Sequence, residues 1–310
     1  SQSYAGIAEG AMYAQWDAID NAGIGQHEAS VTKWVNLVDA NYNLTYRPDS
    51  SLSTTAGFSA TGWDSRSDYK CYFEGCNQAW WKGTGTNFTF EAFVRPKGDR
   101  FTHWSAVKGG IMGNYAQDGT RGLYFGRFMS EKYQFGFEGF GSFTIAKADI
   151  EEYDSRPLLL TMVCDADVGV RMYINGELYA QSGTPSLRGQ TLTFNGPFYI
   201  SRSHSGDTGG FAGSIHSVRV YKKCLSAEDV KKNYQIDMAR FYDATPVELT
   251  SEKRSARAYV QDRLLSQWDA IENAGIGVHR AETDRWADLC SYSVDLKYAT
   301  ANASATFAER

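Results

Sequence analysis

The sequence predicts an all-β protein in which two antiparallel sheets pack into a sandwich, and three observations carry this prediction. Apolar side chains recur at every second position through much of residues 85–222, which is the period of a strand with one buried face. The chain holds 8 Trp, 19 Tyr and 17 Phe beside 30 Gly, a composition that suits pleated surfaces and tight turns. Helical periodicity is confined to the C-terminal part, so short strands separated by turns should form the body of the protein.

The clearest strand pattern is NFTFEAFVRP, residues 87–96. One face should carry Phe88, Phe90, Ala92 and Val94, and the other Thr89, Glu91 and Arg95. YQFGFEGF (133–140) repeats this alternation, with Tyr133, Phe135 and Phe137 opposite Gln134 and Glu138. LLLTMVC (158–164) is almost continuously apolar, which predicts a strand that is covered on both faces.

The next elements are a hairpin and two more strands. Asn175-Gly176 lies between two strand-like runs in VRMYINGELYA (170–180) and tolerates the positive φ angles of a type I′ turn. LTFNGPFYIS (192–201) and SIHSVRVYKK (214–223) supply the further strands. These elements together predict an antiparallel sandwich.

Two short helices are expected at the C-terminal end of this region. LSAEDVKKNYQ (225–235) begins with Ser226 as N-cap and has Asp229 three residues later, close to a capping box. A second helix is expected over about Glu248–Leu265, and Pro246 between the two marks a boundary.

A long internal repeat determines the domain organisation. QWDAIDNAGIG (15–25) returns as QWDAIENAGIG (267–277), and fourteen of the twenty-three positions in 15–37 are identical in 267–289. A period of 252 residues indicates a tandem array of whole domains. We expect a lead over 1–10, a domain over 11–240, a helical linker over 241–262 and a truncated start of a second repeat over 263–310.

The second repeat is too short to bury a sandwich core by itself. It is either a piece of a longer array, or a segment that packs on the first domain or on a neighbouring chain. A leading strand without its sheet favours pairing with an available sheet edge, so self-association by strand exchange stays open.

Charge and hydropathy exclude two classes of partner. The net charge is −5 and no long basic run is present, so a nucleic-acid partner is not expected. No stretch approaches eighteen apolar residues, so this chain contains no predicted membrane span.

The cysteines offer one candidate disulfide. Cys71 and Cys76 in CYFEGC could close a small disulfide loop or form half of a metal site, and no second Cys or His pair lies nearby. A disulfide here would favour an oxidising compartment.

Candidate binding residues are mainly loop aromatics, because a pyranose ring stacks on a flat apolar face while polar neighbours take its hydroxyls. For any single tryptophan the alternative is a place in the core. Asp118 and Arg121 in YAQDGTRG fit a binding edge or a turn tip, and Asp207 could contact calcium or a ligand or belong to a plain hairpin loop. The ligand-binding candidates are Trp63, Trp80, Trp81, Trp104, Asp118, Arg121 and Asp207. Calcium near Asp207 is the one cofactor considered, and no catalytic residue is predicted.

Two further polar groups are better explained by local structure. Asp165 and Asp167 have the spacing of a same-face carboxylate pair, but they follow a strand and are expected to form a turn. His27 could be a metal ligand, but Asn21, Gly23, Gly25 and His27 are more simply expected to shape a loop through hydrogen bonds between side chains and backbone.

Four motifs carry a family resemblance. NFTFEAFVRP resembles a strand of laminin-G-like, concanavalin A-like domains, MYINGELYAQSGT resembles their hairpin, and FAGSIHSVRVYKKCLSAEDVKKNY is similar to their closing signature. The opening WDAIDNAGIGQH resembles the first strand of the bacterial surface-protein branch. The resemblance spans about residues 11–240 and implies a two-sheet antiparallel jelly roll.

The resemblance also implies a function class. Its members are usually exported, often in multidomain bacterial proteins, and mostly bind carbohydrates or proteins. We therefore expect a non-catalytic adhesion-type module at the cell surface or outside the cell, with a glycan or a surface protein as partner. The alternatives are a structural repeat that assembles through contacts between copies and a glycoside hydrolase. The hydrolase is less favoured, because the E-x-D-x-x-E pattern of catalytic relatives is absent from the sequence.

Overall fold

A computed structural model describes most of the first repeat and two short strands of the second. The described residues are 12–30, 32–49, 57–65, 71–76, 87–97, 110–114, 122–129, 132–137, 141–182, 197–203, 206–207, 209–242, 285–286 and 296–297. The chain divides into two compact units, Ser1–Tyr234 and Gln235–Arg310. The predicted second helix over 248–265 lies outside the described residues.

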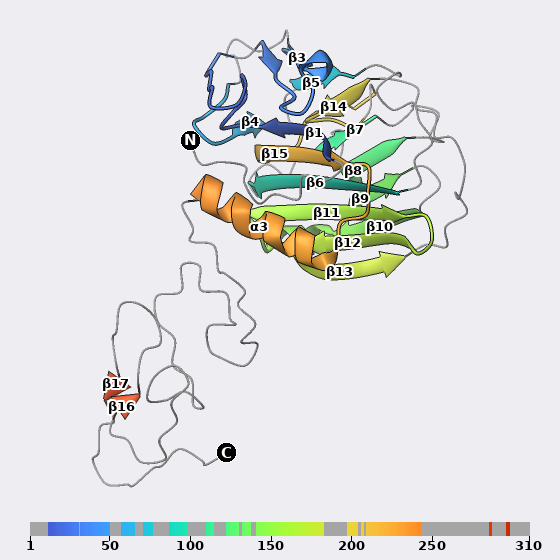
Figure 1. Cartoon of the computed structure of the whole chain (residues 1–310). Coiled ribbons are helices and arrows are strands. Elements are labelled where there is room, and N and C mark those ends of the chain that lie inside the picture. The colour runs from blue at the N-terminus through green and yellow to red at the C-terminus, as the bar shows by residue number, and fades with distance from the viewer. Residues whose placement is uncertain are drawn as a thin grey trace. The chain divides into compact units, whose positions relative to one another are not determined.

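The first unit consists of two antiparallel sheets that face each other (Figure 1). In spatial order the seven-stranded sheet contains β1 (Met12–Asp17), β15 (Gly213–Tyr221), β6 (Asn87–Pro96), β11 (Leu158–Asp165), β12 (Gly169–Ile174) and β13 (Glu177–Ser182), and β4 (Trp63–Ser65) also pairs with β15. The eight-stranded sheet contains β10 (Gly141–Ala146), β9 (Lys132–Phe137), β8 (Leu123–Met129), β7 (Met112–Gly113), β14 (Phe198–Ile200), β5 (Tyr72–Gly75), β3 (Leu44–Arg47) and β2 (Lys33–Trp34). The predicted all-β, two-sheet antiparallel sandwich is therefore confirmed.

Helices are few among the described residues. The 3₁₀ turn η1 spans Ala40–Tyr42, α2 spans Lys147–Glu151 and α3 spans Ala227–Tyr242. The capping box at the start of α3 is present, because Asp229 N–H donates to Ser226 Oγ at 3.0 Å and Ser226 N–H donates to Asp229 Oδ2 at 3.3 Å. The prediction of this helix and of its N-cap is confirmed.

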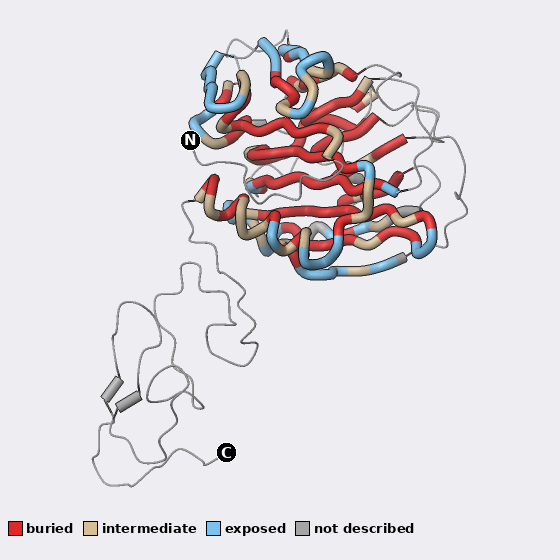
Figure 2. The backbone as a smooth tube through the Cα atoms, viewed as in Figure 1, coloured by how far each residue is buried: buried red, intermediate tan, exposed pale blue. Residues whose placement is uncertain are grey.

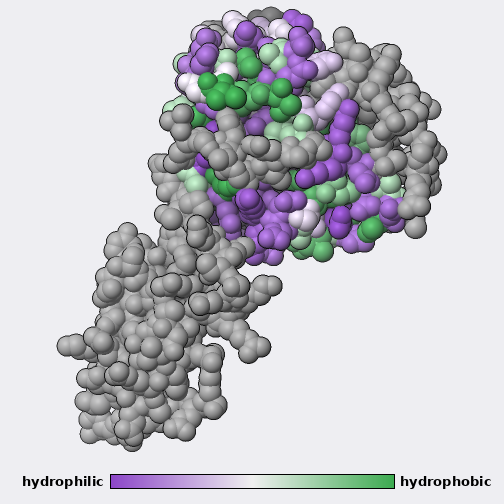
Figure 3. All heavy atoms as spheres, in the orientation of Figure 1, coloured by the Kyte–Doolittle hydropathy of each residue, from purple (hydrophilic) through white to green (hydrophobic). Residues whose placement is uncertain are grey.

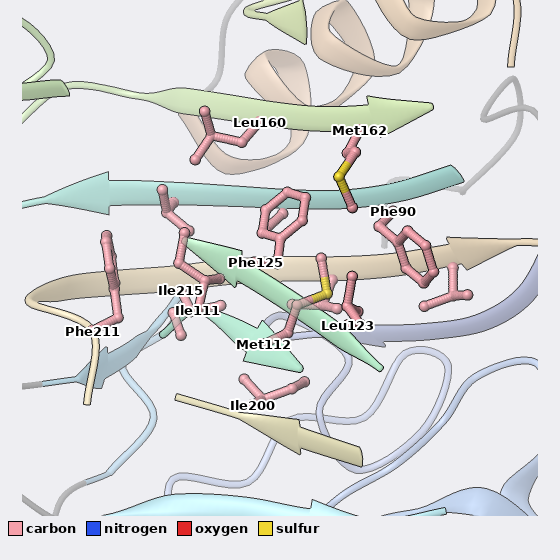
Figure 4. Packing of buried hydrophobic residues seen from close by; sticks show 14 of the residues in the cluster. Phe90, Ile111, Met112, Leu123, Phe125, Leu160, Met162, Ile200, Phe211 and Ile215 are labelled. Atoms are coloured by element: carbon pink, nitrogen blue, oxygen red, sulfur yellow. The ribbon is translucent and has the colours of Figure 1, made fainter. Parts of the chain in front are cut away.

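The predicted strand alternation is confirmed for the face between the sheets. Phe88, Phe90, Ala92 and Val94 of β6 belong to the buried apolar core, and β11 is buried along nearly its whole length. Figure 2 shows this buried interior running along the strands of both sheets. In Figure 4, Phe90, Leu160 and Ile215 from one sheet face Met112, Phe125 and Ile200 from the other. The hairpin turn has φ 50° at Asn175 and φ 85° at Gly176, as the type I′ prediction requires.

The outer face of β6 is buried at Thr89, Glu91 and Phe93, and it contains a polar network. Glu91 and Arg219 of the neighbouring β15 form an ion pair at 2.8 Å with both side chains fully buried. Asn233 of α3 donates its Nδ2–H to Glu91 Oε2 at 2.9 Å, and Thr161 donates to Glu91 Oε1 at 3.0 Å. Since α3 supplies Asn233, this network attaches the first half of the helix to the sheet that it crosses in Figure 1.

The described part of the second unit repeats a hairpin of the first. β16 (Arg285–Trp286) pairs with β17 (Leu296–Lys297), with Arg285 opposite Lys297 and Trp286 opposite Leu296. In the first unit Lys33 is opposite Thr45 and Trp34 is opposite Leu44. At the offset of 252 residues these are the same pairings, so the repeat extends from sequence to strand register.

Among the described residues, no helix combines the length and the apolar character that crossing a membrane would require.

Candidate functional site

A register row of alternating tyrosine and glycine crosses the outer face of the eight-stranded sheet. Successive pairings place seven residues side by side on neighbouring strands, namely Thr45, Glu74, Tyr199, Gly113, Tyr124, Gly136 and Ser142. Their sequence neighbours, such as Phe73, Ile200 and Phe125, belong to the core. Because successive side chains of a strand point to opposite faces, the row lies on the outer face.

Tyr124 lies flat on this face because its cross-strand neighbour is glycine. A Cβ at Gly136 would come within less than 3.0 Å of Tyr124 Cζ, Cε2 and the hydroxyl oxygen. The tyrosine ring therefore covers the place that a side chain at residue 136 would occupy. Tyr124 remains partly exposed, so this ring is an aromatic platform on the sheet surface.

A bulge places an arginine next to this platform. The pairing of β8 with β9 shifts between Phe125 and Arg127, and Gly126 at that point has φ 70°. The extra residue directs Phe125 inward and places Arg127 opposite Gln134, whose strand neighbour at two residues is Gly136. Arg127 and Gln134 thus form a second polar row, which lies two residues along the strands from the row of Tyr124 and Gly136.

On the other side of the row, an arginine stacks on two tyrosines. Arg202 Cζ lies 3.8 Å from the ring centroid of Tyr72 and 5.6 Å from that of Tyr199. The two rings are 5.8 Å apart in a T-shaped arrangement. Burial raises the pKa of Tyr199, and the negative charge of Glu74 raises it further while Arg202 lowers it. Tyr199 therefore keeps its hydroxyl proton at neutral pH, so the hydroxyl can act as a hydrogen-bond donor.

Asp207 holds the segment that carries Arg202 and Ser203. Its Oδ2 accepts from the backbone N–H of Ser203 at 2.6 Å and from Ser203 Oγ at 2.7 Å, and its backbone oxygen accepts from Arg202 at 2.6 Å. Its Oδ1 lies 3.8 Å from Arg127 Nε. A cation at Asp207 would meet the repulsion of Arg127, so this geometry favours a structural role over calcium binding.

The described residues contain no group of three or more His, Cys, Asp or Glu side chains that could hold a metal ion. At the rim of the row, Glu74 is paired with Arg47 at 2.6 Å, and both side chains are partly exposed. The face therefore offers an aromatic ring surrounded by positively charged hydrogen-bond donors and negatively charged acceptors. This is the chemistry that a polyhydroxylated ligand requires.

One predicted site residue lies in the core. Trp63 has no solvent-exposed surface, and its ring makes T-shaped contacts with Tyr46 at 5.5 Å and Phe73 at 4.9 Å. It is opposite Ile215 of β15, whose side chain also faces the sandwich interior. A fully buried ring has no face on which a sugar could stack, so the prediction for Trp63 as a ligand-binding residue is wrong.

The remaining predicted ligand contacts stay predictions. Trp80, Trp81, Trp104, Asp118 and Arg121 lie outside the described residues. Of the two candidates among the described residues, Asp207 lies beside Arg127 of the outer face and Trp63 lies in the core.

The predicted disulfide between Cys71 and Cys76 is not formed. Both thiols are free, with Cys71 Sγ accepting from the Asp49 N–H at 3.4 Å and Cys76 Sγ donating to the Tyr42 carbonyl at 3.3 Å. The four residues of β5 lie between them, and an extended chain of that length separates the two Cα atoms by roughly 15 Å. A disulfide needs less than about 7 Å, so this prediction is wrong.

The expected local roles of the other polar groups are confirmed. Asn21 accepts from the Glu28 N–H at 2.9 Å and donates to the Glu28 carbonyl at 2.7 Å, while His27 Nδ1 lies 3.1 Å from the Ala18 carbonyl. Asp165 Oδ1 accepts from the Asp167 N–H at 2.9 Å and closes a turn after β11. These residues shape loops.

Tyr124, Tyr199 and Arg202 were not predicted as site residues. Tyr124 and Tyr199 lie within strands, whereas the predicted aromatic contacts are tryptophans in loops. The alternation of Leu123, Tyr124 and Phe125 was a usable signal, because it places Tyr124 on the face opposite the core. No sequence signal identified Gly136 as its neighbour, since this pairing depends on strand register.

Comparisons with known proteins agree with the fold. The family model described as the concanavalin A-like lectin/glucanases superfamily matches residues 77–231, which is half of the chain. No curated protein matches the chain significantly.

Among solved structures, the receptor binding domain of botulinum neurotoxin D is similar, with a TM-score of 0.50 and 14% identity over 74% of this chain and 54% of that one. The receptor binding domain of the botulinum neurotoxin C/D mosaic serotype has a TM-score of 0.51 and 14% identity over 74% and 52%. A Trypanosoma rangeli sialidase has a TM-score of 0.50 and 12% identity over 74% and 33%.

This chain spans about half the length of the two toxin domains and 33% of the length of the sialidase. Sequence identities this low establish the fold alone. The family match, the two antiparallel sheets and the order of the strands lead to one conclusion: the chain belongs to the concanavalin A-like lectin/glucanase superfamily.

Proposed function

We propose that this chain is a non-catalytic binding module that takes carbohydrate on the outer face of its eight-stranded sheet. The observation that carries the proposal is the Tyr124 ring lying over Gly136, with Arg127 and Gln134 in the next row. A sugar ring can stack on the outward face of Tyr124 while the guanidinium and amide groups take its hydroxyls.

The family supports the setting of this module. Lectin-like domains commonly act outside the cell, and two of the similar structures are receptor binding domains of toxins. We extend the proposal to an exported adhesion module of a multidomain bacterial surface protein, with a glycan or a glycosylated surface protein as partner. Trp80, Trp81, Trp104, Asp118 and Arg121 stay candidates for further contacts with that ligand.

A glycan array with the full chain, with and without calcium, tests this proposal. We expect binding to at least one glycan class and its loss in Tyr124→Ala. The matched control is Tyr179→Ala, because Tyr179 is an exposed tyrosine on β13 of the other sheet. Equal binding by wild type and Tyr124→Ala would overturn the site, and silence of the wild type across the array would overturn the carbohydrate ligand.

The repeat supports a second function, a structural unit that assembles through contacts or strand exchange between copies. Its observation is that β16 and β17 pair in the same register as β2 and β3 at an offset of 252 residues. On this basis we propose that residues 263–310 begin a second domain of the same fold. Light scattering over a range of concentrations tests association, and a mass that stays that of a monomer at every concentration would contradict it.

A glycoside hydrolase is less well supported. Glu74, the carboxylate in the tyrosine row, is held by Arg47 at 2.6 Å, and Asp207 is bonded to Ser203. Both groups therefore have structural partners, whereas a glycosidase needs one carboxyl group free to give a proton and one free to attack or to activate water. Release of reducing sugar from a bound glycan by the wild type, and its loss in Glu74→Gln, would replace the binding role with an enzymatic one.

A further inference from the structure

The tyrosine row is blocked on one side of Tyr124. Gly113 is the neighbour of Tyr124 in this row, and a side chain there would point outward because Met112 belongs to the core. A Cβ at Gly113 would come within 2.6 Å of the Ser203 carbonyl oxygen and 2.9 Å of Ser203 Cα. Main chain therefore lies directly on the outer surface of the sheet at β7, and residues 201–203 form a step across the row.

This step is held from several directions. Ser203 has no exposed surface, and Asp207 Oδ2 accepts hydrogen bonds from both its N–H and its Oγ. Arg202 stacks on Tyr72 and donates to the Asp207 carbonyl. A Cβ at Gly110 would meet Ser203 Cβ at 2.8 Å, so the glycine allows the step to lie close to the sheet. Moving the step aside would break buried hydrogen bonds, so a ligand at Tyr124 meets a fixed wall on the β7 side.

The opposite side of Tyr124 is more accessible. Its ring leans from β8 towards β9, because Cζ and the hydroxyl oxygen are the Tyr124 atoms closest to a Cβ at Gly136. In the second polar row Arg127 is opposite Gln134, and Gln134 is opposite Thr144 of β10. Arg127 and Gln134 are half-buried and Thr144 is exposed. The ring thus points away from the step and towards side chains that solvent can reach.

The accessible side leads to an edge of the sheet. β10 is at one end of the strand order, three strand spacings from β7. At about 4.8 Å for each spacing, roughly 14 Å of sheet lies between the step and this edge. That length accommodates a short oligosaccharide, and a longer chain can continue past β10. On the β7 side the step closes the row within one spacing of the strand that carries Tyr124.

The outer face of the seven-stranded sheet is occupied differently. Helix α3 crosses it in Figure 1, and Figure 3, which shows this side, has hydrophilic and hydrophobic side chains intermixed on its surface. Asn233 of α3 reaches the buried carboxylate of Glu91 beneath the helix. A flat ligand cannot lie on a sheet face where a helix is packed, so the asymmetry of the eight-stranded sheet determines how a glycan lies on this fold.

We propose that the Tyr124 site recognises the end of a glycan chain. The terminal sugar stacks on Tyr124 against the step, and the rest of the chain runs over β9 and β10 and leaves at the sheet edge. This inference rests on the proposed function and deepens it, because it names the class of carbohydrate as chain ends and excludes internal segments of a polysaccharide. The hydroxyl that only a terminal sugar has free faces the step, and the linkage to the next sugar faces the open side.

Glycans extended at either end test this orientation. The array glycan that binds best is made in two soluble forms, one lengthened by a further sugar at its non-reducing end and one coupled through its reducing end to albumin. In competition with the arrayed glycan, one form should lose affinity by about tenfold or more, because the added group must enter the space of the step, and the other should stay within about twofold. Equal tolerance of both forms would show binding of internal segments. Loss with both would show a site that is closed on both sides, and either result overturns the proposal.

Two matched threonine variants map the path of the chain. Thr144 on β10 and Thr45 on β3 are both exposed, and they lie on opposite sides of the step. Thr144→Trp should change the affinity for the tolerated form by about threefold or more, because the indole lies in the path of the chain. Thr45→Trp should leave this affinity unchanged. Both variants should keep the far-ultraviolet circular dichroism spectrum of the wild type. An effect of Thr45→Trp, or none of Thr144→Trp, would contradict the proposed path.

Failure of this inference is distinguishable from failure of the proposed function. A wild type that binds no arrayed glycan, or binding that survives in Tyr124→Ala, overturns both. Binding that is lost in Tyr124→Ala and yet tolerates both extensions keeps the carbohydrate site and overturns only the recognition of chain ends.

Discussion

Tyr124 and Gly136 are opposite each other on β8 and β9, and the tyrosine ring occupies the space that a side chain at residue 136 would need. The platform on the sheet therefore depends on two residues, one that supplies the aromatic ring and one that supplies no side chain. This relationship can be tested separately from the tyrosine itself.

Gly136→Ala should weaken binding of any glycan that the wild type recognises, by about threefold or more, because a displaced ring loses its stacking geometry. The new Cβ would come within less than 3.0 Å of the ring, so the ring must move. Isothermal titration with the glycan identified on the array measures the effect. Gly57→Ala is the control, since its Cβ would meet its nearest atom, the Ala29 carbonyl oxygen, at 3.4 Å. Unchanged affinity in Gly136→Ala would show that the ring position does not matter for binding.

Arg219→Met should lower the free energy of unfolding by about 3–5 kcal/mol, because it leaves the carboxylate of Glu91 buried without its ion-pair partner. Both side chains are fully buried at 2.8 Å, so solvent does not screen the loss. Urea denaturation measures the change. Lys231→Met breaks the exposed pair with Glu177 and should cost less than about 1 kcal/mol. The double variant Arg219→Met with Glu91→Gln should recover part of the loss, and equal costs for the buried and the exposed pair would contradict this account.

Asn21→Ala should loosen the turn that presents Ile24. The side chain is buried and makes two hydrogen bonds to the backbone of Glu28, so its removal should cost about 1–3 kcal/mol. Hydrogen exchange of the Glu28 amide should accelerate, while the amides of β6 in the sheet centre should exchange at unchanged relative rates. The exposed Asn41→Ala serves as control. Wild-type protection at Glu28 in Asn21→Ala would show that the backbone bonds hold the turn without the clamp.

Cys224 should react slowly with iodoacetamide in the folded protein, even at alkaline pH. Burial raises the pKa of its thiol from 9.0 to about 12, and nearby Asp165 adds to this rise. At pH 9 the fraction of Cys224 present as the reactive thiolate is therefore lower in the folded protein than in the unfolded chain, by roughly two to three orders of magnitude. Because the folded state holds the proton more tightly, the stability that this group contributes is present below pH 9 and is lost as pH rises from 9 towards 12.

Mass spectrometry of peptides after timed alkylation, with and without urea, measures this protection. Cys71 and Cys76 should both be alkylated without prior reduction, because both are free thiols. Rapid labelling of Cys224 in the folded protein, or an intact 71–76 disulfide, would contradict the structure.

Local sequence patterns were sufficient for elements whose formation depends on neighbours in the chain. The alternation in 87–96 predicted β6, Asn175-Gly176 predicted a type I′ turn, and Ser226 with Asp229 predicted the start of α3. Periodicity, preferred φ angles and capping act over a few residues, so the sequence displays them directly. The same local reasoning identified the loop role of Asn21 and His27.

Roles that depend on which strands meet were decided only by the tertiary structure. Trp63 looked like a loop aromatic, but its strand pairs with β15 and turns the ring into the core. Cys71 and Cys76 are close in sequence, but the extended strand between them keeps their thiols apart. Thr89 and Glu91 matched a solvent-facing pattern, but α3 returns over them and buries a polar network.

The sequence by itself therefore determined the fold class, the local turns and caps, and the existence of the repeat. The tertiary structure decided that Tyr124 faces Gly136, that Glu91 faces Arg219, and that Ile24 is left exposed on a rigid turn. The physical reason is that strand register and the covering of a sheet face bring together residues that are far apart in the chain. Local conformational propensity does not specify which of these residues meet.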